Sequence, residues 1–169
     1  MRHRLAVVAP SMAEVVASAG GWIFDRVMAG WHVTVLVAEC EDLRPLRILG
    51  VEAVDLESAL RLMGEHGPLP RALAVAGDLY ESDVRVRRGV QDTLDQHAAE
   101  VTLWGELCPS GLDHRVGSVQ HQLSVAARAF KAQALAALDA PVDPIGDIET
   151  FRSSELLLWP GASDLIPAS

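Results

Sequence analysis

Four residues carry the side chains best suited to chemistry. Asp113 and His114 are adjacent, and a carboxylate beside an imidazole can work as a catalytic acid/base pair in a cleft. Arg115 follows directly, and we expect it to line the same cleft. Glu14 lies shortly after the apolar run 5–9 and is the remaining candidate. These residue types predict either proton transfer or the binding of a polar molecule.

The same residues supply a candidate zinc site. Catalytic zinc commonly needs three protein ligands and an open position for water. Glu14 and His114 would be two of the ligands, and Cys108, or Cys40 in its place, would be a soft third. Each has a structural alternative: a buried cysteine, an acidic side chain that complements a helix dipole, or a histidine that begins a helix. We therefore expect no cofactor, with zinc as the alternative.

The composition argues against several function classes. The chain of 169 residues has 23 acidic and 14 basic side chains, and its formal charge of −9 disfavours binding to a phosphate backbone. No apolar run reaches about 20 residues, the length needed to cross a bilayer. We therefore expect neither a nucleic-acid partner nor a membrane-embedded protein. The two cysteines are too few for a disulfide scaffold, which favours the cytoplasm.

The first forty residues predict a strand, a helix and a second strand. The run 5–9 is apolar throughout, which is typical of a strand buried on both faces. Ser11 can cap a helix over 12–29, where apolar residues recur at helical spacing, and Gly30 can end it. The β-branched stretch 32–38 then predicts a second strand, parallel to the first.

The rest of the chain continues the alternation of strands and helices. For the segment 71–76 the sequence leaves two alternatives, a short strand or a buried turn. The other expected elements are, in order, a helix over 41–49 broken near Pro45, a strand over 51–56, a helix over 57–63, a helix from Ser82 to Ala98, a fourth parallel strand over 100–104, a helix over 114–138 and a strand over 155–159. Together they predict one Rossmann-like, three-layer α/β/α domain over 1–169 with a mostly parallel sheet.

This fold class fixes where a ligand would bind. In such sheets the ligand lies beyond the carboxyl ends of the strands, here the segments 10–14, 38–41 and 105–114. The side chains expected to line that cleft are Ser11, Met12, Glu14, Trp104 and Arg115. The Gly20-Gly21 pair lies inside the predicted helix, so it is not a nucleotide-binding fingerprint.

The order and spacing of several motifs resemble the PIG-L/LmbE zinc N-deacetylases. The N-terminal unit has V-V-A-P over 7–10, A-G-G over 19–21, then Gly30 and H-V-T-V over 32–35. The resemblance implies the fold predicted above. It also implies a zinc site at the turn after the first strand, where the family carries A-H-P-D-D-E and this chain carries A-P-S-M-A-E over 9–14.

The family's catalytic turn is altered in this sequence. Counting back from the glycine pair places Ser11 at the histidine ligand, Ala13 at the aspartate base and Glu14 at the aspartate ligand. Counting forward from Ala9 shifts these positions by one residue, to Pro10 and to the Met12-Ala13 pair. Both alignments remove the histidine ligand and the base.

A second family motif, H-x-D-H-R followed by x-x-G, is similar to the segment 111–117. His114 would match the third zinc ligand, whereas Gly111 replaces the first histidine. The sequence therefore favours a non-catalytic member that binds a small molecule or a partner protein. The alternative is an amide or acetamido hydrolase with a rebuilt site of Glu14, His114 and a cysteine. Because 50% of so short a chain is apolar, we also expect a homo-oligomer.

Overall fold

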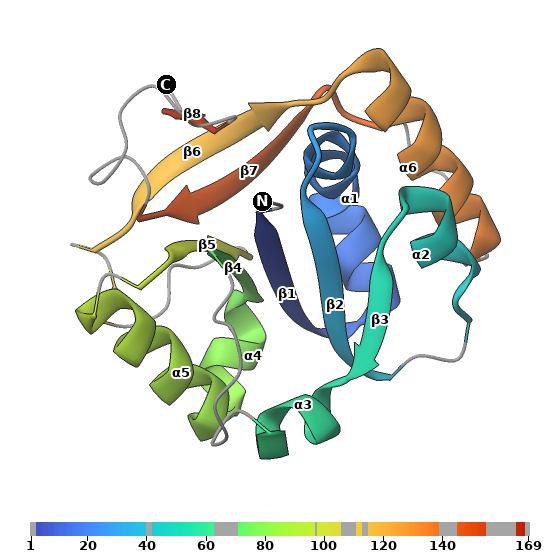
Figure 1. Cartoon of the computed structure of the whole chain (residues 1–169). Coiled ribbons are helices and arrows are strands. Elements are labelled where there is room, and N and C mark those ends of the chain that lie inside the picture. The colour runs from blue at the N-terminus through green and yellow to red at the C-terminus, as the bar shows by residue number, and fades with distance from the viewer. Residues whose placement is uncertain are drawn as a thin grey trace.

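One sheet organises the chain (Figure 1). The computed structural model describes residues 3–39, 42–62, 71–96, 98–105, 111–112, 115–138, 145–154 and 165–167. The strands in this part are β1 (Arg4–Ser11), β2 (His32–Glu39), β3 (Glu52–Asp55), β4 (Ala72–Ala76), β5 (Glu100–Trp104), β6 (Gly117–Gln122), β7 (Ile148–Ser153) and β8 (Ile166–Pro167). The helices are α1 (Met12–Met28), α2 (Arg44–Leu49), α3 (Leu56–Leu62), α4 (Gly77–Ser82), α5 (Val84–Asp95) and α6 (Val125–Ala137).

The sheet is mixed: the strands of its first half are parallel, and those of its second half are antiparallel. The strand order is β3-β2-β1-β4-β5-β7-β6-β8, and the neighbours from β3 to β5 pair in parallel. β7 then pairs antiparallel with β5, and β6 pairs antiparallel with β7 and with β8. The predicted Rossmann-like α/β class is therefore confirmed, with an antiparallel extension that the sequence analysis did not include.

Helices cover both faces of the sheet, because the parallel strands are apolar on both faces (Figure 1). Alternate residues of β1, such as Val7, pack on the side of α1, whereas Val8 packs on the side of α5. A further cluster of buried side chains lies between α1, α2 and α6. These three helices form one outer layer and α4 and α5 belong to the other, as Figure 1 shows.

The predicted N-terminal unit is confirmed. β1, α1 and β2 lie within a residue or two of the expected ranges, and Ser11 is the N-cap of α1. Gly30 has a φ of 98°, in the left-handed region, so a residue with a side chain would be strained where the chain leaves α1. The stretch 71–76, left open between strand and turn, contains β4 in the middle of the sheet.

Two predicted helix starts are wrong. Pro45 does not break a helix: it occupies the first turn of α2, where its missing N–H is not needed. Ser82 does not cap the helix that follows it, because it is the last residue of α4. Asp83 caps α5 instead, and its carboxylate accepts from the backbone N–H groups of Arg85 and Val86.

The predicted helix over 114–138 is also wrong in its first half. The stretch 117–122 is β6, in which the buried residues Val119 and His121 alternate with more exposed ones, the period of a strand. Ser124 then caps α6, since its hydroxyl accepts from the Ala127 N–H at 3.0 Å. β7 was not expected, and the expected strand over 155–159 lies outside the described residues.

Candidate functional site

The turn between β1 and α1 lies at the carboxyl edge of the parallel strands. The Ser11 hydroxyl caps α1 by accepting a hydrogen bond from the Glu14 backbone N–H at 3.3 Å. Met12 is buried and Ala13 is exposed. Ser11 also stands opposite Glu39 in the pairing of β1 with β2. The structure thus brings Ser11, Met12 and Glu14 to the edge where α/β sheets bind ligands.

A pocket of about 310 Å³ opens beside this turn. Small-molecule sites usually measure roughly 300 to 1,000 Å³, so the pocket suits a small ligand. Its walls come from the ends of β1 and β2, from the start of α1, from the start of α2 and the segment before it, and from the end of α6. The residues that line it are Ser11, Met12, Ala13, Glu39, Asp42, Arg44, Ala137 and Leu138.

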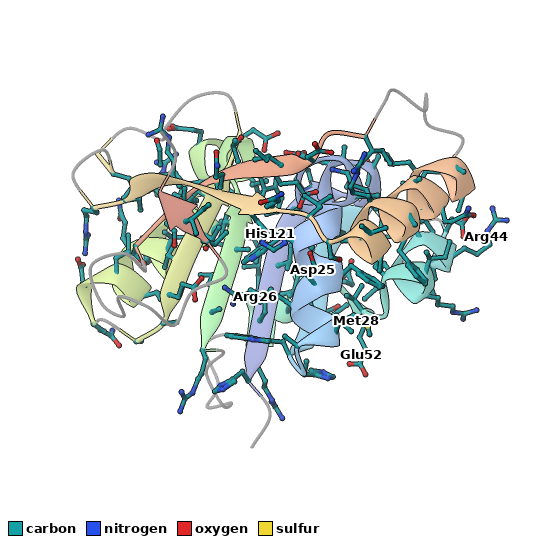
Figure 2. All side chains as sticks on the ribbon, turned by 90° about the horizontal axis from the view of Figure 1, so that it is seen from above. Asp25, Arg26, Met28, Arg44, Glu52 and His121 are labelled. Carbon is teal, nitrogen blue, oxygen red and sulfur yellow. The ribbon has the colours of Figure 1, made fainter. Side chains whose placement is uncertain are left out.

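A fork of two charged side chains forms one wall of the pocket. The Arg44 guanidinium donates to both carboxylate oxygens of Asp42, with Nη2 at 2.6 Å from Oδ2 and Nε at 3.1 Å from Oδ1. These hydrogen bonds, together with one from the Arg44 backbone N–H, hold the pKa of Asp42 below its ordinary value. Arg44 Nη2 also lies 3.5 Å from the carbonyl oxygen of Ala137, which links α2 to the end of α6 (Figure 2).

Glu14 faces the opposite side of the β1–α1 turn. Trp104, the last residue of β5, donates its indole N–H to Glu14 Oε1 at 3.3 Å. Asp78, in the first turn of α4, also interacts with the Glu14 carboxyl. Burial raises the pKa of Glu14, and the negative charge of Asp78 and its hydrogen bond raise it further, although the Trp104 N–H acts in the other direction. Two carboxyl groups and an indole N–H therefore meet at this edge.

Part of this cluster is predictable from the sequence. Glu14 and Trp104 were both expected in the cleft, and the structure brings them into contact. Asp78 was not predicted, because the segment 71–76 was undecided between a strand and a turn. Residues at the edge of a sheet can be identified only where the end of a strand is known. Asp78 comes two residues after β4, which would have been the signal.

Arg115, also expected in the cleft, has another partner. Its Nη1 lies 2.9 Å from Asp95 Oδ1. Asp95 ends α5, and β5 begins at Glu100, so this ion pair lies toward the amino ends of the strands. The structure does not bring Arg115 to Glu14. The remaining candidates, Asp113, His114, Cys108 and Cys40, lie outside the described residues. Within the described ranges, no three side chains of His, Cys, Asp or Glu are grouped as metal ligands would be.

A buried ion pair holds the centre of α1, the helix that begins at the pocket. Glu149, on β7, accepts from the backbone N–H groups of Gly21 and Trp22 at 3.0 and 2.6 Å. Lys131, on α6, donates to Glu149 at 2.7 Å and to the carbonyl oxygen of Ala17 at 2.8 Å. This cluster fastens α1 to α6 and β7, two elements from the C-terminal part of the chain.

The glycine pair within α1 now has a structural role. A Cβ at Gly21 would lie 2.2 Å from Leu123 Cδ2, a distance that no packed pair of carbon atoms adopts. Gly21 therefore lets the residues before α6 approach α1 closely. At Gly20 the nearest atom to an added Cβ would be 3.4 Å away, which is an ordinary contact.

A second polar cluster fixes the other half of α1. Asp25 accepts from the Ser124 hydroxyl at 2.6 Å and lies 2.8 Å from His121 Nε2 (Figure 2). Burial raises the pKa of Asp25, but the hydrogen bonds from Ser124 and His121 outweigh it, so the pKa lies below its ordinary value. Ser124 is the N-cap of α6, so this cluster positions the helix whose far end forms the pocket wall.

Comparisons with known proteins give structural matches alone. No family model matches the chain, and no curated protein matches its sequence. Each helix in the described part of the chain is too short or too polar to cross a membrane.

Solved structures that match this chain include several deacetylases. The A40926 pseudoaglycone deacetylase Dbv21 has a TM-score of 0.63 at 15% identity, over 90% of this chain and 97% of that one. A deacetylase bound to teicoplanin, from the teicoplanin biosynthesis pathway, has a TM-score of 0.60 at 14% identity, over 89% and 98%. The zinc-inhibited form of teicoplanin deacetylase Orf2 has a TM-score of 0.59 at 13% identity, over 89% and 97%. Across nearly its whole length, this chain has the fold of these deacetylases.

Proposed function

We propose that the chain binds a small molecule in the pocket beside the β1–α1 turn and lacks the zinc-dependent deacetylation of the family it resembles. The observation that carries the proposal is the pocket itself. Its volume of about 310 Å³ and its mixture of apolar, hydroxyl and charged side chains suit a small polar ligand better than a flat protein surface. Protein binding, the other expected mode, has no comparable support.

The residues of the β1–α1 turn support the absence of the family's chemistry. In the resemblance described above, one alignment places Ala13 at the catalytic base, and a methyl group cannot accept a proton. Glu14 is the turn residue whose side chain could still bind metal, and its carboxylate already accepts from Trp104 at 3.3 Å.

A pocket-filling variant tests the binding proposal. Ala13 is exposed on the pocket wall, so Ala13→Phe should fill the space without disturbing the core. A fragment library screened by ¹H–¹⁵N NMR should give ligands that shift the resonances of Glu39 and Leu138 in the wild type but not in Ala13→Phe. Ala126→Phe, at an exposed position of α6, is the matched control and should keep those ligands. Fragments that bind both variants equally well would contradict the proposal.

A zinc-dependent hydrolase is the second candidate, and the proximity of Glu14 and Asp78 favours it. Two neighbouring carboxyl groups repel when both are ionised, and a cation between them would remove that repulsion. Zinc would activate water, with Glu14, His114 and Cys108 as the ligands that the sequence suggests. The donor described by the structure, Glu14, fits zinc in type.

Metal analysis separates the two candidates. Protein purified from zinc-supplemented medium should contain well under one zinc per chain if the binding proposal holds. About one zinc per chain in the wild type, lost in both His114→Ala and Glu14→Gln, would establish the hydrolase instead. Two expectations from the sequence stay predictions: a cytoplasmic location, and a homo-oligomer that light scattering of the purified chain would detect.

A further inference from the structure

We infer that the pocket selects small molecules that carry an ammonium group. This inference rests on the proposed function, because it concerns the same pocket and names the chemical class of its ligand. Among the described residues that line the pocket, one carboxylate, one ion pair and the carboxyl end of α6 support it.

Glu39 is the carboxylate available to a ligand. It ends β2 at the pocket and is exposed, and its carboxylate has no hydrogen bond or ion pair with another described residue. An exposed carboxylate at the rim of a small cavity can accept two or three hydrogen bonds from a primary ammonium ion. Charge-assisted hydrogen bonds of this kind are about twice as strong as neutral ones.

The cationic side chain of the pocket wall is already neutralised. Arg44 makes a forked contact with the Asp42 carboxylate at 2.6 and 3.1 Å. Its charge therefore does not attract an anionic ligand as an unpaired guanidinium would. Among the described residues that line the pocket, the remaining charge is that of the Glu39 carboxylate.

The carboxyl end of α6 at the pocket acts in the same direction. Ala137 ends the 13-residue helix α6, and the carboxyl end of a helix carries partial negative charge, which favours a cation. The amino end of α1 carries partial positive charge. The Ser11 hydroxyl caps this end and Glu14 lies in its first turn, so the positive potential is offset. The apolar side chains of Met12 and Leu138 provide a surface for the carbon skeleton of a ligand.

A matched pair of probes tests the inference. trans-2-Aminocyclohexanol and trans-cyclohexane-1,2-diol have the same ring and differ in one group, ammonium or hydroxyl. Titrations followed by ¹H–¹⁵N NMR at the Glu39, Ala13 and Leu138 resonances give Kd values for both. We expect the amine to bind about ten-fold more tightly than the diol, the size of one charge-assisted hydrogen bond.

Two variants assign the preference to Glu39. In Glu39→Gln the amine should lose its advantage, so that both probes bind with similar Kd values. Glu52→Gln is the control: Glu52 begins β3, at the amino edge of the sheet, and lies apart from Arg44 in Figure 2. It should leave the ten-fold preference unchanged.

The outcomes separate the inference from the proposed function. Equal Kd values for the two probes in the wild type, with shifts at the pocket, would overturn the ammonium preference and leave small-molecule binding intact. An amine preference that survives in Glu39→Gln would overturn the role of Glu39. Absence of shifts with both probes would overturn the inference, and the fragment screen with Ala13→Phe would then decide the proposed function independently.

Discussion

Lys131 Nζ lies 2.7 Å from Glu149 Oε2, and the two residues are only 7% and 5% exposed. A buried charge destabilises the fold unless a group of opposite charge lies beside it. Lys131→Met should therefore destabilise the fold by about 3–5 kcal/mol, because it leaves the Glu149 carboxylate unpaired in the interior. Urea unfolding followed by circular dichroism measures the change.

The control for this experiment is an ion pair of similar geometry at the surface. Arg128 Nη1 lies 3.0 Å from Asp147 Oδ1, and both side chains are exposed. Arg128→Met should change the free energy of unfolding by about 0–1 kcal/mol. If Lys131→Met cost no more than Arg128→Met, the buried pair would not hold α1 in place.

Adjacent glycines should respond oppositely to alanine. In Gly21→Ala the new Cβ would lie 2.2 Å from the Leu123 side chain, so the segment before α6 must move away from α1, at a cost of about 1–3 kcal/mol. Gly20→Ala meets nothing closer than 3.4 Å and should stabilise the helix by about 0.5–1 kcal/mol. Melting temperatures of the two variants should lie on opposite sides of the wild-type value. If both variants lost stability, the close approach of Leu123 to Gly21 would not explain the difference between the two glycines.

Asp25 should make the stability depend on pH in the acid range. Its pKa in the fold lies below the ordinary value of 3.8, so the carboxylate stabilises the fold above pH 3.8 and this contribution is lost as the pH falls through the folded pKa. Asp25→Asn should be less stable than the wild type near neutral pH, and the difference should shrink below pH 3.8. Denaturant unfolding at several pH values measures it. A difference that stays constant with pH would show that the charge of Asp25 is not involved.

Glu14 should titrate in the opposite sense. Its pKa in the fold lies above the ordinary value of 4.5, so its ionisation opposes folding as the pH rises from 4.5 through the folded pKa. Glu14→Gln should therefore gain stability relative to the wild type over that range. The Trp104 indole donates to Glu14, so a fluorescence titration that Glu14→Gln abolishes would report the midpoint directly.

Asp78→Asn is the companion variant for that titration. It removes the second carboxyl group, so the midpoint should move down toward 4.5 while the contact between Glu14 and Trp104 remains. Asp92→Asn, at an exposed position on α5, should leave the midpoint unchanged. A midpoint that stays unchanged in Asp78→Asn would show that Glu14 and Asp78 do not interact.

The parallel half of the fold could be predicted, because its strands are buried on both faces and therefore form continuous apolar runs. β1 is of this kind, and β2 has buried valines on one face and half-buried residues on the other. β7 could not be predicted in this way: its buried positions include Glu149 and Ser153, which are polar. What makes Glu149 acceptable in the interior is its contact with Gly21, Trp22 and Lys131, and no local pattern reveals partners so distant in the chain.

The candidate site was predictable to the same extent. Ser11 and Glu14 follow an apolar strand directly, and the position of a strand end is a local property of the sequence. Arg115 was placed in the cleft because of its position in a motif. Its ion pair with Asp95 depends on the packing of α5, which the motif does not reveal. The pocket draws Ala137 and Leu138 from the far end of α6, whose start was predicted incorrectly.

The contact between Glu149 and Gly21 also bears on the order in which the protein assembles. The carboxylate meets a backbone N–H 128 positions earlier in the chain, so a ribosome completes most of the protein before it can form. Contacts of such long sequence separation slow folding, because the loop between them must close first. The first strands and α1 can gather early, but the interior of α1 reaches its final environment only when β7 joins the sheet.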